Sequence, residues 1–276
     1  MNRPRVIVHT VASVDGRVSL GPNRTGFEDV ADPRWHKIWS SEETLEESVR
    51  RLALTHRPQA FLEGSGSFAK EDEPLLPLAP SEYPVAELHH DYLPDTVVHR
   101  PGHRGWFAAV DGRGRLRSGM KEFPGWDGWH TLHLVSHGAP PEYLAHLRRL
   151  QIPYLIAGEQ RVDLGRAFEK LKALLAVECI VSTAGSRLNG ALLRAGLVDE
   201  ISLVLLPAVI GGCATPTLFR SPDLGPDDPP VRLELLSAKG EPSGRVCLHY
   251  RVVQEAKSAS VEPTAPANAS QPMPTS

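Results

Sequence analysis

The sequence predicts an α/β fold in which a mostly parallel sheet is flanked by helices and ends in a C-terminal antiparallel hairpin. Short apolar runs alternate with helical patterns through most of the chain, which is typical of repeated β-α units. After Pro207 the rhythm changes to two alternating runs, Val231 to Leu236 and Arg245 to Val253, joined by a glycine- and proline-containing segment. Two such runs with a short connection predict a terminal hairpin.

Length and composition favour one compact domain. A chain of 276 residues with 41% hydrophobic residues can bury one sizeable core. We therefore predict a single domain over residues 1–253. From Gln254 onward Ala, Ser, Pro and Thr dominate and no apolar pattern remains, so residues 254–276 are predicted to be a disordered tail.

Charge and hydropathy exclude several classes of partner. The net charge is −3 and the basic residues are scattered, which argues against nucleic acid. The amino terminus lacks the apolar core of a signal peptide, and no run approaches the roughly 18 apolar residues that span a bilayer. Three widely spaced cysteines suit buried thiols in a reducing compartment: Cys179, Cys213 and Cys247. We expect a cytoplasmic protein with no membrane partner.

The amino-terminal part predicts one strand and one helical region. Apolar residues over 6–11 form the strand, and the turn that follows contains Asp15 and Gly16, which supply the bend. Helical spacing extends over residues 33–54, in one piece or in two pieces that break near Ser40 and Ser41.

The middle of the chain predicts further β-α units. Gln59 to Glu63 reads as a short strand that ends in a glycine turn, Gly64 to Ser67. Residues from Pro74 to Gly105 show no sustained period, which favours a functional or interface loop. The remaining elements are strands over 106–110, 132–136 and 154–157 and helices over 140–150 and 164–175.

The most informative stretch runs from Cys179 to Gly212 and reads as a buried strand, a glycine turn, a helix and a second buried strand. Gly185 is expected to let the turn form without a Cβ clash, and the amides from Ser186 to Gly190 open the helix, where they can point at an anion. The turn lies at the carboxyl end of a strand, where α/β folds place ligands. The alternative is a junction that binds nothing, because one glycine turn is weaker evidence than a full dinucleotide fingerprint.

Two other groups of residues have side chains that occur in binding sites. His89, His90 and Asp91 have metal-ligating side chains, but adjacent residues of an extended segment point to opposite sides, so we predict no metal. Trp126, Trp129 and His130 could line a pocket for a flat ring or simply fill the core.

Five separated motifs occur in a fixed order. They are A-S-V-D-G-R from Ala12, F-L-E-G-S-G-S from Phe61, V-D-G-R-G-R-L from Val110, T-A-G-S-R-L-N-G-A-L-L-R-A-G-L-V-D-E from Thr183, and P-A-V-I-G-G from Pro207. Together they resemble the reductase domain of the riboflavin-biosynthesis deaminase-reductases, a branch of the dihydrofolate-reductase-like fold, over residues 5–253. The zinc deaminase motifs H-x-E and P-C-x-x-C are absent from the sequence.

The resemblance implies NADPH as the hydride donor and a homodimer as the assembly. It implies cofactor contacts from residues that follow the predicted strands, with Arg161 as the partner of the 2′-phosphate. These residues are Ala12, Gly64, Ser67, Gly112, Arg161, Ala184, Gly185, Ser186, Arg187, Leu188, Asn189 and Gly190.

The substrate side departs from the family pattern. At the substrate we expect Arg57, Asp72, Leu76 and Thr183. Asp15 is the catalytic candidate, where it would polarise the substrate or orient a water, although by default it is a structural turn residue. The family has a glutamate where this chain has Thr183, and arginines where it has Thr55 and Ala79. A phosphorylated ribitylaminopyrimidine needs charged partners, so these losses argue against that substrate unless neighbours such as Arg57 replace them.

The sequence therefore predicts an NADPH-dependent reductase that acts on a C=N or C=O bond of a small heterocyclic substrate. That substrate is either ribosylaminopyrimidine-like or pteridine-like. The alternative is a dinucleotide-binding sensor or scaffold without turnover.

Overall fold

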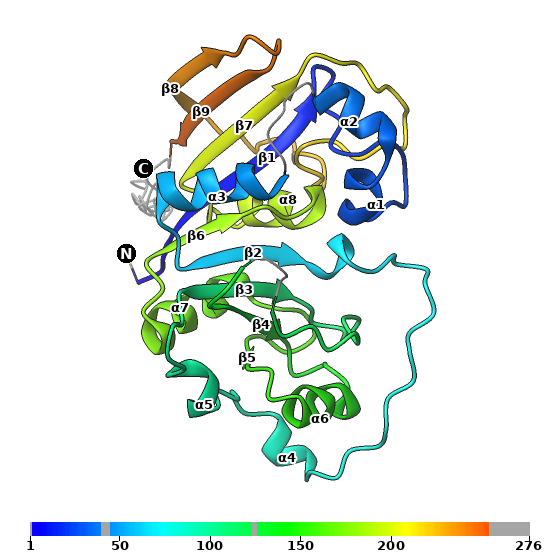
Figure 1. Cartoon of the computed structure of the whole chain (residues 1–276), viewed down its shortest axis with the longest axis vertical. Coiled ribbons are helices and arrows are strands. Elements are labelled where there is room, and N and C mark those ends of the chain that lie inside the picture. Colours follow the sequence, from blue (N-terminus) through cyan, green and yellow to red (C-terminus); the bar gives the residue numbers. More distant parts are fainter. Residues whose placement is uncertain (1, 40–44, 123–125, 254–276) are drawn as a thin grey trace, which may run out of the picture.

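A computed structural model describes residues 2–39, 45–122 and 126–253 of the chain. These residues form a nine-stranded sheet in the order β5-β4-β3-β2-β6-β1-β7-β9-β8, with helices on both faces (Figure 1). The predicted tail over 254–276 and the predicted helix break near Ser40 and Ser41 lie outside the described residues.

The strands confirm the predicted mixture of parallel and antiparallel pairing. Strands β1 to β7 pair only in parallel with one another, whereas β9 runs antiparallel to both β7 and β8. Their bounds are β1 (Arg5–Ser13), β2 (Ala60–Gly64), β3 (Gly105–Val110), β4 (Trp129–Val135), β5 (Tyr154–Ile156), β6 (Cys179–Ser182), β7 (Glu200–Leu206), β8 (Leu233–Gly240) and β9 (Val246–Val252).

Helices connect most of the parallel strands. Their bounds are α1 (Gly26–Val30), α2 (Pro33–Trp39), α3 (Leu45–His56), α4 (Val85–Leu88), α5 (Asp95–Val98), α6 (Pro141–Arg149), α7 (Leu164–Leu175) and α8 (Ser186–Arg194), with a 3₁₀ turn η1 (Ser65–Ser67). Helix α1 was not predicted; a capping box between Thr25 and Glu28 starts it. The stretch from Pro74 to Gly105, expected to have no regular structure, contains the short helices α4 and α5.

The two faces of the sheet bury different helices. On one face Phe168 of α7 and Leu192 of α8 pack against alternate strand residues such as Leu62. On the other face two separate clusters form: Leu52 of α3 packs with Phe61, and Leu144 of α6 packs with Val135. Trp129 belongs to the cluster of Phe61, with its ring centre 5.0 Å from that of Phe61. Trp129 is therefore a strand and core residue, the second of the two interpretations that its sequence allowed.

The parallel arrangement brings several predicted turns to one edge of the sheet. Because β1, β2, β3 and β6 point the same way, the segments that follow them meet at their carboxyl ends. These segments begin at Val14, Ser65, Asp111 and Thr183. In the part of the chain that the structure describes, no helix is both long and apolar enough to cross a membrane.

The buried imidazole of His9 makes the stability of the fold pH-dependent. Burial is the main cause that lowers the pKa of His9 to about 4, and His56 and Arg51 add to the effect. In the unfolded chain His9 takes up a proton near pH 6.5, whereas in the folded chain His9 does so only near pH 4. Stability is therefore lost as pH falls through this window.

We expect the free energy of unfolding to fall by about 1–3 kcal/mol between pH 7 and pH 4 on account of His9. His9→Asn, which keeps a polar atom near Ser202 Oγ, the partner 3.1 Å from Nδ1, should reduce that slope in urea titrations at a series of pH values. An unchanged slope in the variant would show that His9 does not carry this dependence.

Candidate functional site

The turn between β6 and α8 leaves a helix amino terminus open. Gly185 is the N-cap, and no side chain caps the first turn of α8. The φ of Gly185 is −68°, a value that any residue adopts, and a Cβ placed there would meet no atom within 4 Å. The predicted reason for this glycine, relief of a clash within the turn, is therefore wrong. What the glycine provides is open space directly in front of the helix amides.

Asn189 stabilises this turn from inside. Its side chain is completely buried, with Oδ1 accepting a hydrogen bond from Ser182 Oγ at 2.8 Å and Nδ2 donating to the carbonyl of Ala184 at 2.7 Å. Both functional atoms are thus used within the protein. Asn189 was predicted to bind cofactor, but its contacts are those of a residue that holds the turn in shape.

Three more of the predicted cofactor residues have packing partners in the protein. A Cβ on Gly190 would lie 2.4 Å from the carbonyl oxygen of Arg220, so this glycine allows α8 to approach the chain at Arg220. A Cβ on Gly64 would lie 3.6 Å from Leu188 Cδ2, which places the end of β2 against α8. Gly190, Gly64 and Leu188 therefore set how closely α8 sits on the sheet.

A carboxyl group from β2 lies beside the same turn. Glu63 Oε1 accepts a hydrogen bond from Thr183 Oγ1 at 2.5 Å, and Oε2 accepts one from Ser67 Oγ at 2.7 Å. Burial raises the pKa of Glu63, and the two hydroxyl donors only partly offset this effect. Glu63 was not among the predicted site residues, although a charged residue at the end of an otherwise apolar strand is a usable signal.

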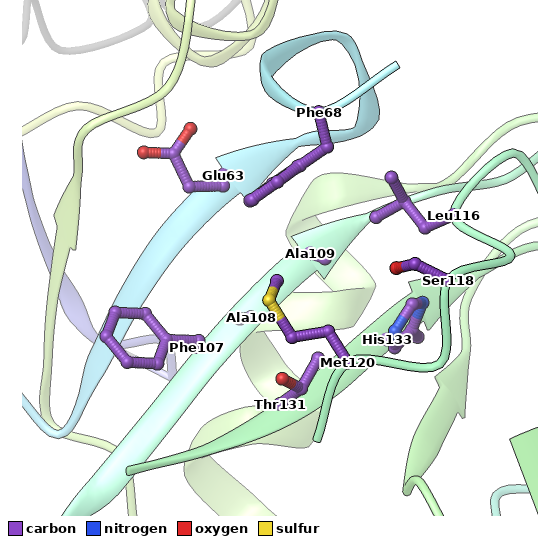
Figure 2. Close-up of a pocket in the computed structure, with 10 residues that line it drawn as sticks. All are labelled: Glu63, Phe68, Phe107, Ala108, Ala109, Leu116, Ser118, Met120, Thr131 and His133. Carbon is purple, nitrogen blue, oxygen red and sulfur yellow. The ribbon is translucent and has the colours of Figure 1, made fainter. Parts of the chain in front are cut away.

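Figure 2 shows Glu63 at the rim of a cavity of about 40 Å³ over β3 and β4. The wall is mostly apolar, with Phe68 and Met120 above the strand residues Phe107 and Thr131. The carboxylate of Glu63 points away from Phe68 and Met120. It therefore faces the side of the β6–α8 turn rather than the apolar wall.

Two arginines from different turns meet at one carboxylate. Arg187 of α8 forms an ion pair with Glu71, and Arg113, from the turn after β3, lies 3.5 Å from the other oxygen of Glu71. All three side chains are at least half exposed. Two guanidinium groups with one carboxylate leave a positive charge at the carboxyl edge of the sheet. Only Arg187 of this group was predicted, because nothing in the sequence indicates which distant segments meet.

A buried network anchors the turn that carries Arg113. Asp111 Oδ2 accepts from the amide of Leu116 at 2.8 Å and from the hydroxyl of Tyr143 at 2.9 Å. The Tyr143 oxygen lies 2.7 Å from His133 Nδ1, and burial lowers the pKa of His133 to about 4. Since Tyr143 donates to Asp111, a neutral His133 must donate from Nδ1. The network fixes both ends of the Asp111–Leu116 turn.

The segment with the predicted substrate residues Asp72 and Leu76 is tied to the same turn. The side chain of Arg115 donates to the carbonyl of Lys70, and that of Arg117 donates to the carbonyl of Leu76. Asp72 accepts from Asn23 Nδ2 at 2.9 Å. Asp72 and Leu76 therefore border the site, and their role at the substrate stays a prediction.

Asp15 holds the loop that follows β7. Its carboxylate accepts from Ser13 Oγ at 2.5 Å and from the amides of Ile210 and Gly211 at 3.1 and 2.8 Å. The hydrogen bond from Ser13 is the main cause that lowers the pKa of Asp15 to about 2. An acid of that pKa is ionised at neutral pH, so these contacts favour the structural interpretation; a catalytic role stays a prediction. Ala12, also predicted, is buried in β1 next to this turn.

Arg57 and Arg161 lie apart from this group. Arg57 begins the connection between α3 and β2, at the amino end of the strands, so the full length of β2 separates it from Gly64. Arg57 thus lies at the other end of the strands from the β6–α8 turn, and its role at the substrate stays a prediction. Arg161 follows β5, and its neighbour Val162 has Cγ2 3.2 Å from where a Cβ on Gly112 would lie. Arg161 and Gly112 thus occupy adjacent loops, beyond Arg113.

Asp91, one of the three residues with metal-ligating side chains at 89–91, serves the fold. Asp91 accepts from Lys170 Nζ at 2.8 Å and from the amide of Ile156 at 2.8 Å. Over the described ranges, no three His, Cys, Asp or Glu side chains are grouped as a metal site.

Comparisons with known proteins place this arrangement in a family. A family model described as the RibD C-terminal domain matches residues 4–244. The 2,5-diamino-6-ribosylamino-4(3H)-pyrimidinone 5′-phosphate reductase of Methanothermobacter thermautotrophicus is 29% identical over 238 residues, 84% of this chain and 91% of that protein.

Solved structures agree on the fold. A pyrimidine reductase-like protein from Corynebacterium diphtheriae is similar with a TM-score of 0.57 at 16% identity, covering 92% of this chain and 94% of that one. The riboflavin biosynthesis reductase of Saccharomyces cerevisiae gives a TM-score of 0.52 at 15% identity, covering 92% and 91%. The predicted resemblance is confirmed, as is the predicted mostly parallel sheet with its antiparallel C-terminal hairpin. The chain belongs to the RibD C-terminal domain family of reductases.

Proposed function

We propose that the chain is an NADPH-dependent reductase of a ribosylaminopyrimidine phosphate, the substrate class in the name of its Methanothermobacter relative. The observation that carries the proposal is the open amino terminus of α8 beside the Glu63 carboxyl group. An anion-binding turn and a polar group for a heterocycle therefore lie next to each other. The departure at Thr183, which argued against that substrate, is offset by the carboxyl group of Glu63 beside it.

The turn residues suit a nicotinamide dinucleotide. The amides of Ser186 and Arg187 would hold its diphosphate, because they point out of an uncapped helix terminus with open space before Gly185. When bound, the cofactor supplies the hydride. The residues of this chain orient the reactants and exclude water, and Glu63, Thr183 and Ser67 form the polar wall on the substrate side.

Arg113 and Arg187 provide a reason to prefer NADPH over NADH. A 2′-phosphate needs charged donors that can bind two of its oxygens, which guanidinium groups provide. These two groups already converge on the carboxylate of Glu71, which a phosphate could displace. Arg161, the partner expected from the sequence, is an exposed side chain in the neighbouring loop.

The hairpin β8–β9 is the surface we propose for a homodimer. Strand β8 ends the sheet, and it exposes Leu233, Leu235 and Leu236 by 43%, 54% and 38%. An edge strand with exposed leucines is a liability unless another surface covers it. A second copy of the chain is the partner that the family resemblance implies. A cytoplasmic location stays a prediction from the sequence.

The proposed activity is tested by mixing the protein with NADPH and candidate pyrimidines or pterins and following NADPH oxidation by stopped flow. Oxidation with a ribosylaminopyrimidine phosphate supports the proposal. Oxidation with pterins alone would show that the substrate is a pterin and not a pyrimidine. Binding of NADPH without oxidation by any of them would favour a sensor or scaffold and contradict the reductase.

Gly185→Val should weaken NADPH binding by at least about tenfold, or 1.4 kcal/mol, because the added side chain fills the space in front of the amides. No protein atom lies near that position, so the variant should fold normally. The matched control is Gly240→Val, whose added Cβ also meets no atom within 4 Å but lies on β8. Equal affinities for all three proteins, measured by calorimetry, would place the cofactor elsewhere.

Arg113→Gln and Arg187→Gln should each raise the Kd for NADPH about tenfold or more and leave the Kd for NADH within about twofold, because only NADPH carries the 2′-phosphate. Arg161→Gln is the comparison variant. If only Arg161→Gln loses affinity for NADPH, then Arg161 binds the 2′-phosphate and Arg113 and Arg187 do not.

Leu235→Glu should convert a dimer to a monomer in analytical ultracentrifugation, because a buried charge at the centre of the exposed leucines is costly. Leu54→Glu serves as the control, since Leu54 of α3 is 79% exposed and lies on another surface. A wild-type protein that sediments as a monomer would overturn the proposed dimer.

A further inference from the structure

We infer that Glu63 determines substrate specificity by accepting two hydrogen bonds from the 2-amino group and the adjacent ring N–H of a 2-aminopyrimidinone, and that it discriminates against the 2-oxo ring of a uracil. The inference rests on the proposed function and adds the residue and the ring edge that it recognises. It starts from the hydrogen bonds that Glu63 makes and from those that it leaves unmade.

Half of the acceptor capacity of Glu63 is used. A carboxylate has about four acceptor positions, two on each oxygen. Thr183 Oγ1 occupies one position on Oε1, and Ser67 Oγ occupies one on Oε2. Each oxygen therefore keeps one free position. Two free acceptors side by side match a ligand that presents two parallel N–H groups.

The surroundings of Glu63 leave this capacity to a ligand. The groups that affect its pKa are the two hydroxyls and burial, and no cation of the described chain is among them. Burial raises the pKa of Glu63, because the surrounding protein solvates the ionised carboxylate less well than water does. A ligand that donates two hydrogen bonds would supply the missing stabilisation of the ionised form.

The position of the carboxyl group suits a substrate beside the cofactor turn. Thr183, which donates to Glu63, is two residues before Gly185, and its amide donates to Leu62 of β2 at 3.1 Å. Figure 2 shows the carboxylate turned away from Phe68 and Met120. A ring bound on its free side would therefore lie next to the turn proposed for NADPH.

The chemistry of the ring decides the preference. In a 2-amino-4(3H)-pyrimidinone the 2-amino group and N3–H are neighbouring donors, and an ionised carboxylate accepts from both. In a uracil the 2-position is a carbonyl oxygen, which would face a carboxylate oxygen and leave it unpaired. A polar site built for a donor discriminates strongly against an analogue that lacks it.

The inference is tested with two substrates that differ only at the 2-position, amino or oxo, both as 6-ribosylamino 5′-phosphates. We expect wild-type protein to prefer the amino compound by about 100-fold in kcat/KM. In Glu63→Gln the side chain presents one acceptor and one donor, so the preference should fall to about unity or reverse. Glu178→Gln is the matched control, because Glu178 pairs with Lys172 at the opposite end of the sheet.

A second measurement needs no variant. A protonated Glu63 presents one donor and one acceptor, the pattern that a uracil matches. Because the pKa of Glu63 is raised, lowering the pH of the wild-type protein should reduce the preference, measured as the ratio of the two Kd values in the presence of NADP⁺. A structural role for Glu63 would not move this ratio.

The outcomes separate this inference from the proposed function. If neither pyrimidine is reduced, the proposed function fails. If both are reduced equally well, or if the preference is the same in Glu63→Gln and at every pH, the proposed function stands and the role of Glu63 is overturned. Thermal unfolding of Glu63→Gln checks its folding, and the pH series decides the matter if that variant is unstable.

Discussion

The buried amide of Asn189 is the contact on which the candidate site depends. The usual way to stabilise the start of a helix is a Ser, Thr, Asp or Asn side chain at the N-cap, which consumes one of the free amides. Here Gly185 occupies that position, and Asn189 stabilises the turn through Ser182 Oγ and the carbonyl of Ala184. The turn is thus rigid although its amides stay free, which is the combination that an anion site requires.

Other loops at the carboxyl edge of the sheet are also held by polar side chains. The turn after β3 is fixed from inside by Asp111, whose carboxylate binds Tyr143 and the Leu116 amide, so that Arg113 projects from a rigid support. The loop after β7 is fixed by Asp15 through the amides of Ile210 and Gly211. In each case a buried or saturated polar side chain stabilises the loop, and an adjacent residue is left to meet the ligand. These carboxylates act in the structure of the loops, through the hydrogen bonds that they accept from them.

The sequence was sufficient where a local pattern carries the information. The period of apolar residues located most of the strands and the longer helices, and the glycine turn after β6 located the candidate site. It was insufficient where distant segments meet. The contact between Glu63 and Thr183 joins residues 120 positions apart, and that between Arg187 and Glu71 joins residues 116 apart. The packing role of Gly190 was missed for the same reason, because only the fold shows that the chain at Arg220 passes over it.

The pair Glu63 and Thr183 shows how a carboxyl group can lie at one place in a fold while moving between positions in the sequence. Strands β2 and β6 are parallel neighbours, so side chains at their ends that share a face are about 5 Å apart at the backbone. A glutamate on either strand can place its carboxylate between them. The resemblance led us to expect the acid at position 183, where the chain has a threonine that donates to the acid from β2. Comparing the sequences position by position, one concludes that the family glutamate at position 183 is lost. In the structure a carboxylate is present at that place, because Glu63 supplies it and Thr183 orients it.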